Sequence, residues 1–79
     1  MNQLVTSFQK NKFEEVRVYV KEFKGYDLLD IRVYTSLKDK PEEMIPTGKG
    51  LSLNVSHFGD LKKALQELES VLKENKFIE

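Results

Sequence analysis

A run of alternating residues from Glu15 to Tyr34, EVRVYVKEFKGYDLLDIRVY, constrains this chain more than any other feature. A period of two is typical of β-strands, in which successive side chains point to opposite faces. The alternation breaks at Lys24-Gly25-Tyr26-Asp27, where glycine can adopt the positive φ that a tight turn needs. The pattern predicts an antiparallel hairpin of strands 13–24 and 28–35, closed at Gly25-Tyr26.

The two faces of this hairpin differ in chemistry. One is apolar and contains Val16, Val18, Val20, Leu29, Ile31 and Val33. The other combines rings with cations, and the predicted closure pairs Phe23 with Leu28, Lys21 with Asp30, Tyr19 with Arg32, and Arg17 with Tyr34. Rings between cations suit single-stranded nucleic acid, whose bases stack on aromatic side chains while its phosphates bind Lys and Arg. The same pattern also suits a solvated strand face or a protein-binding face.

The remaining segments complete a small domain. Residues 1–12 are polar without clear periodicity and are interpreted as a tail or strand lead-in, which leaves 13–79 as one domain. After a charged loop at 36–43, a short edge strand at 44–48 and a further strand at 49–54 are expected. Asn54 is a suitable N-cap for a helix over 55–77. The order predicts an α+β fold in which the helix covers one face of the sheet.

The predicted helix has a narrow apolar stripe with steps of three and four residues, the spacing found in paired helices. Its members are Phe58, Leu61, Leu65, Leu68 and Leu72. Because a chain of 79 residues makes only a marginal core on its own, we expect two copies to pair through this stripe.

Composition excludes several classes of protein. The chain has no cysteine, so it contains no disulfide, thiolate zinc site or cysteine nucleophile. No apolar run approaches the roughly 20 residues of a membrane span, and no signal peptide follows Met1. We therefore expect a cytoplasmic protein, associated with the nucleoid when bound to DNA. The balance of 13 Lys+Arg against 13 Asp+Glu argues against a strongly basic nucleic-acid arm.

The sequence offers little for catalysis. His57 is the one histidine, and no triad partners for it are evident. Glu42-Glu43 makes only a weak cation site, and Gly48-Lys49-Gly50 lacks the spacing of a phosphate-binding P-loop. We expect no enzymatic activity, no cofactor and no metal.

Three motifs, in order and at matching spacing, point to a family. F-K-G at Phe23, D-I-R-x-Y at Asp30 and K-G-x-S-L-N at Lys49 resemble the transcriptional coactivator family of positive cofactor 4, and the resemblance runs from about Phe13 to Leu72. It implies four curved antiparallel strands and one helix that dimerises, with grooves that bind single-stranded DNA. Carried over by position, Phe23 would be a stacking platform, and Lys24, Arg32 and Lys49 would bind phosphates, with Lys21 at a further basic position.

The chain departs from the family pattern at three places. Thr35 stands where relatives often have tryptophan, so Tyr19 or Tyr34 would have to supply the missing ring. Tyr26 replaces a basic residue, and Thr47-Gly48 lacks a second cation before Lys49. Fewer neutralised phosphates imply a shallower salt dependence than that of a more basic relative.

The sequence thus predicts sequence-tolerant binding of single-stranded DNA by a homodimer that assists transcription, replication or repair. The expected contact residues are Arg17, Tyr19, Lys21, Phe23, Lys24, Tyr26, Arg32, Tyr34 and Lys49. A protein-interaction module using the same face, or binding of single-stranded RNA, remains the alternative. Salt separates the protein alternative, since phosphate contacts weaken steeply as salt rises.

Overall fold

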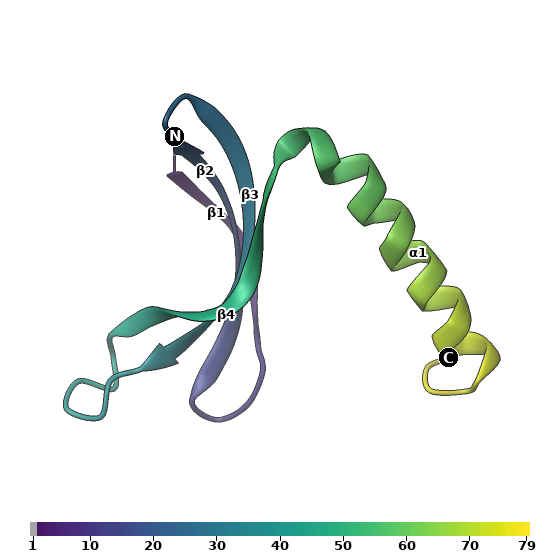
Figure 1. Cartoon of the computed structure of the whole chain (residues 1–79). Helices are drawn as coiled ribbons and strands as arrows, with labels where there is room; N and C mark the ends of the chain where they lie inside the picture. Colours follow the sequence, from purple (N-terminus) through teal and green to yellow (C-terminus); the bar gives the residue numbers. More distant parts are fainter. Residues whose placement is uncertain (1) are drawn as a thin grey trace.

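The computed structural model describes residues 2–79, which form a curved antiparallel sheet followed by one long helix (Figure 1). In chain order the elements are β1 (Asn2–Gln9), β2 (Glu14–Phe23), β3 (Tyr26–Ser36), β4 (Met44–Asn54), a short 3-10 helix η1 (Val55–His57) and α1 (Phe58–Glu74). Each strand pairs with the next along the chain, in the order β1-β2-β3-β4. This architecture confirms the predicted fold class.

The β2–β3 hairpin forms as predicted, but its register differs by two residues. Lys24 and Gly25 have φ values of 51° and 83°, so the turn consists of these two residues, a conformation that suits the twist of paired strands. The predicted pairs were therefore wrong. The observed pairs are Phe23 with Tyr26, Lys21 with Leu28, Tyr19 with Asp30, Arg17 with Arg32, and Glu15 with Tyr34.

A shift of two residues preserves the alternation, so each side chain keeps its predicted face. We call one side the aromatic–cation face, defined by Arg17, Tyr19, Lys21 and Phe23 of β2 with Leu28, Asp30, Arg32 and Tyr34 of β3. The other side is the valine face, defined by Val16, Val18, Val20, Leu29, Ile31 and Val33.

Of the two interpretations of residues 1–12, a tail or a strand lead-in, the strand fits residues 2–9. β1 pairs with β2 along its length, from Asn2 opposite Lys21 to Gln9 opposite Glu15. All its side chains are exposed, which explains why no hydrophobic alternation marks this strand in the sequence. The sheet therefore begins before the predicted domain boundary at residue 13; Met1 lies outside the described residues.

β4 is one continuous strand where the sequence predicted two. Its pairing with β3 shifts once, between Arg32 and Tyr34, as expected for a β-bulge. Pro46 lies opposite Tyr34 and does not end the strand, because β4 is at the edge of the sheet.

The predicted helix at 55–77 is η1 followed by α1. The Asn54 side chain accepts a hydrogen bond from the Ser56 N–H at 2.9 Å, as a cap residue should. The α-helix then ends at Glu74, before the predicted end.

The helix does not cover the sheet within one chain, so that expectation was wrong. It leaves the end of β4 and extends away from the sheet (Figure 1). Only its first turn, through Phe58 and Leu61, lines a pocket with the valine face. Leu29 and Tyr34 are the only buried apolar residues of 2–79. The apolar stripe of α1 is consequently left open.

No helix in the described part of the chain combines the length and apolar character that crossing a membrane requires.

Candidate nucleic-acid interface

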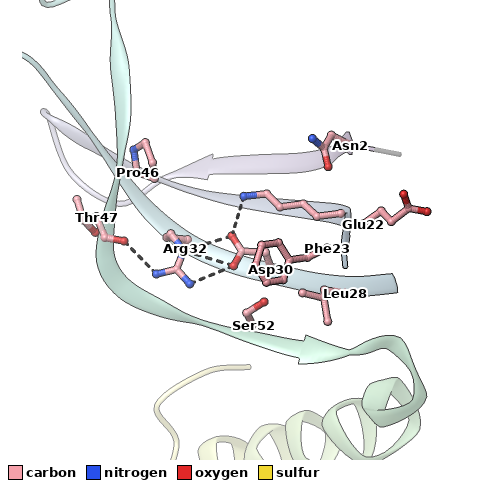
Figure 2. A pocket seen from close by; sticks show the side chains of 10 residues that line it. Asn2, Glu22, Phe23, Leu28, Asp30, Arg32, Pro46, Thr47 and Ser52 are labelled. Atoms are coloured by element: carbon pink, nitrogen blue, oxygen red, sulfur yellow. Dashed lines mark hydrogen bonds and ion pairs between the residues drawn. The ribbon is translucent and has the colours of Figure 1, made fainter. Parts of the chain in front are cut away.

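A buried carboxylate organises the centre of the aromatic–cation face. Asp30, which is 3% exposed, accepts hydrogen bonds from Arg32 Nε at 3.3 Å and from Arg32 Nη2 at 3.1 Å. Lys21 Nζ lies 3.6 Å from Asp30 Oδ2, so two cations share the Asp30 carboxylate (Figure 2). Because the hydrogen bonds to Asp30 favour the charged guanidinium, the pKa of Arg32 is raised above its ordinary value.

The bulge in β4 provides a second anchor for the same arginine. Arg32 Nη1 donates to the Thr47 carbonyl oxygen at 3.0 Å, as Figure 2 shows. Thr47 is itself held, since its Oγ1 donates to the Val33 carbonyl oxygen at 2.8 Å. The guanidinium is thus oriented from β3 and β4 together, and one N–H on each terminal nitrogen stays free for a ligand.

An open groove surrounds these groups. It is lined by Asn2, Lys21, Glu22, Phe23, Leu28, Asp30, Arg32, Pro46, Thr47 and Ser52. Residues from β1, β2, β3 and β4 meet in it, so curvature of the whole sheet produces the groove. Figure 2 shows Arg32 and Asp30 side by side in the groove.

Farther along the same face, aromatic rings alternate with cations. Arg17 Cζ lies 4.6 Å from the ring centroid of Tyr34, and the Tyr19 and Tyr34 centroids are 5.9 Å apart. Lys21 Nζ is 5.0 Å from the Tyr19 centroid. These are distances typical of cation–π contacts. Arg17 also binds Glu15, and this hydrogen bond is the main cause that raises the pKa of Arg17.

The burial of Tyr34 limits what it can do. Its side chain is 6% exposed beneath this cluster, so its ring has no open face for a base. Tyr34 therefore supports Arg17 and Tyr19 and does not replace a missing stacking platform.

The open rings lie at the hairpin end. Phe23 and Tyr26 are cross-strand partners, and they are 61% and 63% exposed. Lys24 Nζ lies 5.3 Å from the Phe23 centroid. Lys24 has no ion pair within residues 2–79, so its charge is available to a ligand.

Lys49 is not brought together with these residues. It lines a separate shallow depression with Val16 and Val33 of the valine face, with Leu51 of β4 and with Arg32. The hydrogen bond from the Asn11 side chain is the main cause that lowers the pKa of Glu14, and Lys49 makes a smaller contribution. In one chain, Lys49 therefore lies apart from Phe23 and Tyr26, at a depression that Arg32 also borders.

Sequence reasoning treated Asp30 as an ordinary cross-strand partner and did not assign a role to Thr47. The D-I-R motif places Asp30 and Arg32 on one face, which is a usable signal for their pairing. Thr47 carries no such signal, because its contact depends on the bulge in β4.

The remaining candidates lie apart. Phe58, Leu65 and Leu68 of the stripe are at least half exposed, while Leu61 and Leu72 are partly covered. His57 is exposed and lies 3.9 Å from Asp60. Residues 2–79 contain no group of three His, Cys, Asp or Glu side chains that could hold a metal ion.

Comparisons with known proteins identify a family and similar folds. The family model described as Transcriptional Coactivator p15 (PC4) matches residues 10–64. An RNA polymerase II transcriptional coactivator, KELP, from Arabidopsis thaliana is 40% identical over 57 residues, which are 72% of this chain. The chain spans about a third of the length of that relative, 33%.

Solved structures share the fold. A PC4 homolog from Burkholderia pseudomallei superposes with a TM-score of 0.76 at 18% identity, covering 86% of this chain and 89% of its own. A bacteriophage T5 homolog of PC4, implicated in recombination-dependent DNA replication, gives a TM-score of 0.67 at 23% identity and covers 96% of this chain and 80% of its own. The family model covers well over half of the sequence, and the chain belongs to the transcriptional coactivator p15 (PC4) family.

Proposed function

We propose that this protein is a homodimer that binds single-stranded DNA with little sequence preference and so assists transcription, replication or repair. The observation that carries the proposal is the exposed Phe23–Tyr26 pair with the unpaired Lys24, at the end of a groove whose cations are held in place. Membership of a coactivator family supports a binding role rather than an enzymatic one. The phage relative's link to DNA replication supports a nucleic-acid ligand.

In the proposed mode, bases stack on Phe23 and Tyr26, and phosphates bind Lys24 and the free N–H groups of Arg32. Lys21 and Arg32 already share Asp30, so a phosphate must approach next to a carboxylate. The fixed cations hold the DNA backbone in one position, while the nearby carboxylate lowers the affinity for phosphate. Tyr19 and Arg17 border that path on the same face.

Dimerisation is proposed because two apolar surfaces are open in one chain. The valine face is only partly covered, and the α1 stripe is exposed at Phe58, Leu65 and Leu68. A second copy can bury both at once, which a small chain needs for a sufficient core. A dimer could also present Lys49 of one copy beside the aromatic–cation face of the other.

The deciding experiment is fluorescence anisotropy of a labelled single strand of about 20 nucleotides, competed with duplex and repeated across salt. We expect tight binding that duplex displaces poorly, with log K falling linearly as log salt rises. Absence of binding at low salt would overturn the proposal.

The exposed rings also suit a protein partner, because aromatic residues and Arg are enriched at protein interfaces. A complex with a partner protein through these rings would persist at high salt, whereas a complex with single-stranded DNA would weaken. A parallel titration with RNA of the same sequence tests whether the 2′-hydroxyl matters.

A further inference from the structure

We infer that Phe13, with Lys12 and Lys38, forms a second stacking subsite for single-stranded nucleic acid, at the end of the sheet opposite Phe23. The inference rests on the function proposed above and extends its ligand path along β2. Phe13 and Phe23 have similar surroundings. Phe13 is 64% exposed with Lys12 Nζ 5.8 Å from its ring centroid, whereas Phe23 is 61% exposed with Lys24 Nζ at 5.3 Å.

The backbone at Phe13 is firmly held. Asn11 Oδ1 accepts hydrogen bonds from the N–H groups of Phe13 and Glu14, at 3.0 Å and 2.9 Å. The Phe13 carbonyl oxygen accepts from the Ser36 N–H at 3.3 Å, which continues the β2–β3 register by one pair. A ring on such a fixed backbone loses little conformational freedom when a base stacks on it.

The two rings belong to one side of the sheet by strand alternation. Phe13 directly precedes β2 and extends its register by one pair with Ser36, and its position differs from that of Phe23 by ten, so alternation assigns both to the aromatic–cation side. At about 3.3 Å per residue, they are roughly 33 Å apart along β2. A strand that reaches both rings passes Arg17 and Tyr19 on the way.

The surroundings of Phe13 suit a phosphate chain. Phe13 lines an open groove with Thr35, Ser36, Leu37, Lys38 and Pro41. Lys12 and Lys38 have no ion pair within residues 2–79, and Lys40 is engaged by Glu43 at 3.9 Å. The Glu14 carboxylate is occupied by Asn11 and Lys10, at 2.8 Å and 3.6 Å, and so does not neutralise Lys12. Unpaired cations beside an exposed ring are the requirement for binding single strands.

The chain's composition allows a direct test, because it contains no tryptophan. The variants Phe13→Trp, Phe23→Trp and Phe8→Trp each introduce one fluorophore; Phe8 is similarly exposed but faces Val16 on the valine side. Titration with an unlabelled oligothymidine of about 20 nucleotides should quench the tryptophan at positions 13 and 23, because bases stack on both, and leave the one at position 8 unchanged.

The variant Phe13→Ala measures how much the Phe13 ring contributes to the affinity for single-stranded DNA. We expect its affinity for the same oligonucleotide to fall about 5- to 150-fold, with circular dichroism and melting temperature unchanged. Quenching at position 23 without quenching at position 13, or a Phe13→Ala affinity equal to wild type, would overturn the second subsite and leave the proposed function intact. Equal quenching at positions 8 and 13 would also overturn it. Absence of binding by the wild-type chain would instead overturn the proposed function, and this subsite with it.

Discussion

Phe23 is an exposed side chain whose proposed role is in ligand binding and not in the fold. It lies at the end of β2 opposite Tyr26 and makes no buried contact. We expect Phe23→Ala to weaken single-strand binding by about 1–3 kcal/mol, because one stacking platform is lost. Anisotropy measures the affinity, and Phe8→Ala is the matched control on the valine side. Unchanged affinity in Phe23→Ala would remove its stacking role.

Asp30 is the opposite case, a buried residue that acts on two cations at once. Asp30→Asn should lower the free energy of unfolding by about 1–3 kcal/mol, because the negative charge and one of the two acceptor oxygens that face Arg32 and Lys21 are lost. It should also steepen the salt dependence of single-strand binding by roughly 0.7 for each cation released to a phosphate.

Chemical denaturation and salt-dependent anisotropy measure the two effects. Asp27→Asn removes an exposed carboxylate from the same strand and should change neither. A variant at position 30 with wild-type stability and salt slope would show that Asp30 does not hold Lys21 and Arg32.

At the scale of elements, the close approach of β4 to β3 depends on one glycine. A Cβ at Gly50 would lie 2.4 Å from the Ile31 carbonyl oxygen and 2.7 Å from Arg32 Cα, both backbone atoms that cannot easily move. Gly50→Ala should therefore destabilise the fold by about 1–3 kcal/mol or more. Gly48→Ala is the control, since its Cβ meets nothing within 4 Å. Equal melting temperatures for the two variants would contradict this account.

The helix provides the second test at this scale. Leu65 lies in the middle of the α1 stripe and is 53% exposed in one chain. If the stripe pairs with a second copy, Leu65→Asp buries an unpaired charge and should weaken the dimer by about 3–5 kcal/mol.

Sedimentation equilibrium would measure this change. Ser70→Asp introduces the same carboxylate on the polar side of α1 and should leave the assembly unchanged. A Leu65→Asp variant that dimerises like wild type would exclude pairing through the stripe.

The local patterns predicted these elements well, within limits. Alternation identified β2 and β3, and the three-four spacing identified α1. β1 could not be distinguished from a tail, because all its side chains are exposed and no apolar period marks it. β4 was divided because Pro46 usually ends a strand, whereas an edge position tolerates it.

At the scale of the whole molecule, one chain buries very few apolar side chains. Only Leu29 and Tyr34 are buried apolar residues in the described chain, and α1 packs on the sheet through its first turn alone. If dimerisation completes the core, stability depends on protomer concentration. The melting temperature should rise by roughly 3–5 °C for each tenfold increase in concentration. Calorimetry over a hundredfold range would show this, and a constant melting temperature would mean that the single chain is stable alone.

Some features of the candidate site follow from local sequence patterns, and others depend on the tertiary structure. A period of two assigned the residues of the aromatic–cation face, and this assignment survived the register error because the error was even. Distances within the face were beyond sequence reasoning, since the two-residue turn at Lys24-Gly25 set them. Whether each predicted residue binds DNA stays a prediction.

The sequence by itself determined the two faces of the hairpin, the apolar stripe of α1 and the family, because each depends on short-range periods or contiguous motifs. Only the tertiary structure decided that Asp30 and Tyr34 are buried, that Thr47 binds Arg32, that Lys49 lies apart from Phe23 and Tyr26 and that α1 leaves the sheet. These features arise from sheet curvature, a bulge and the direction of the last strand. They depend on contacts between segments distant in the chain, which no local pattern contains.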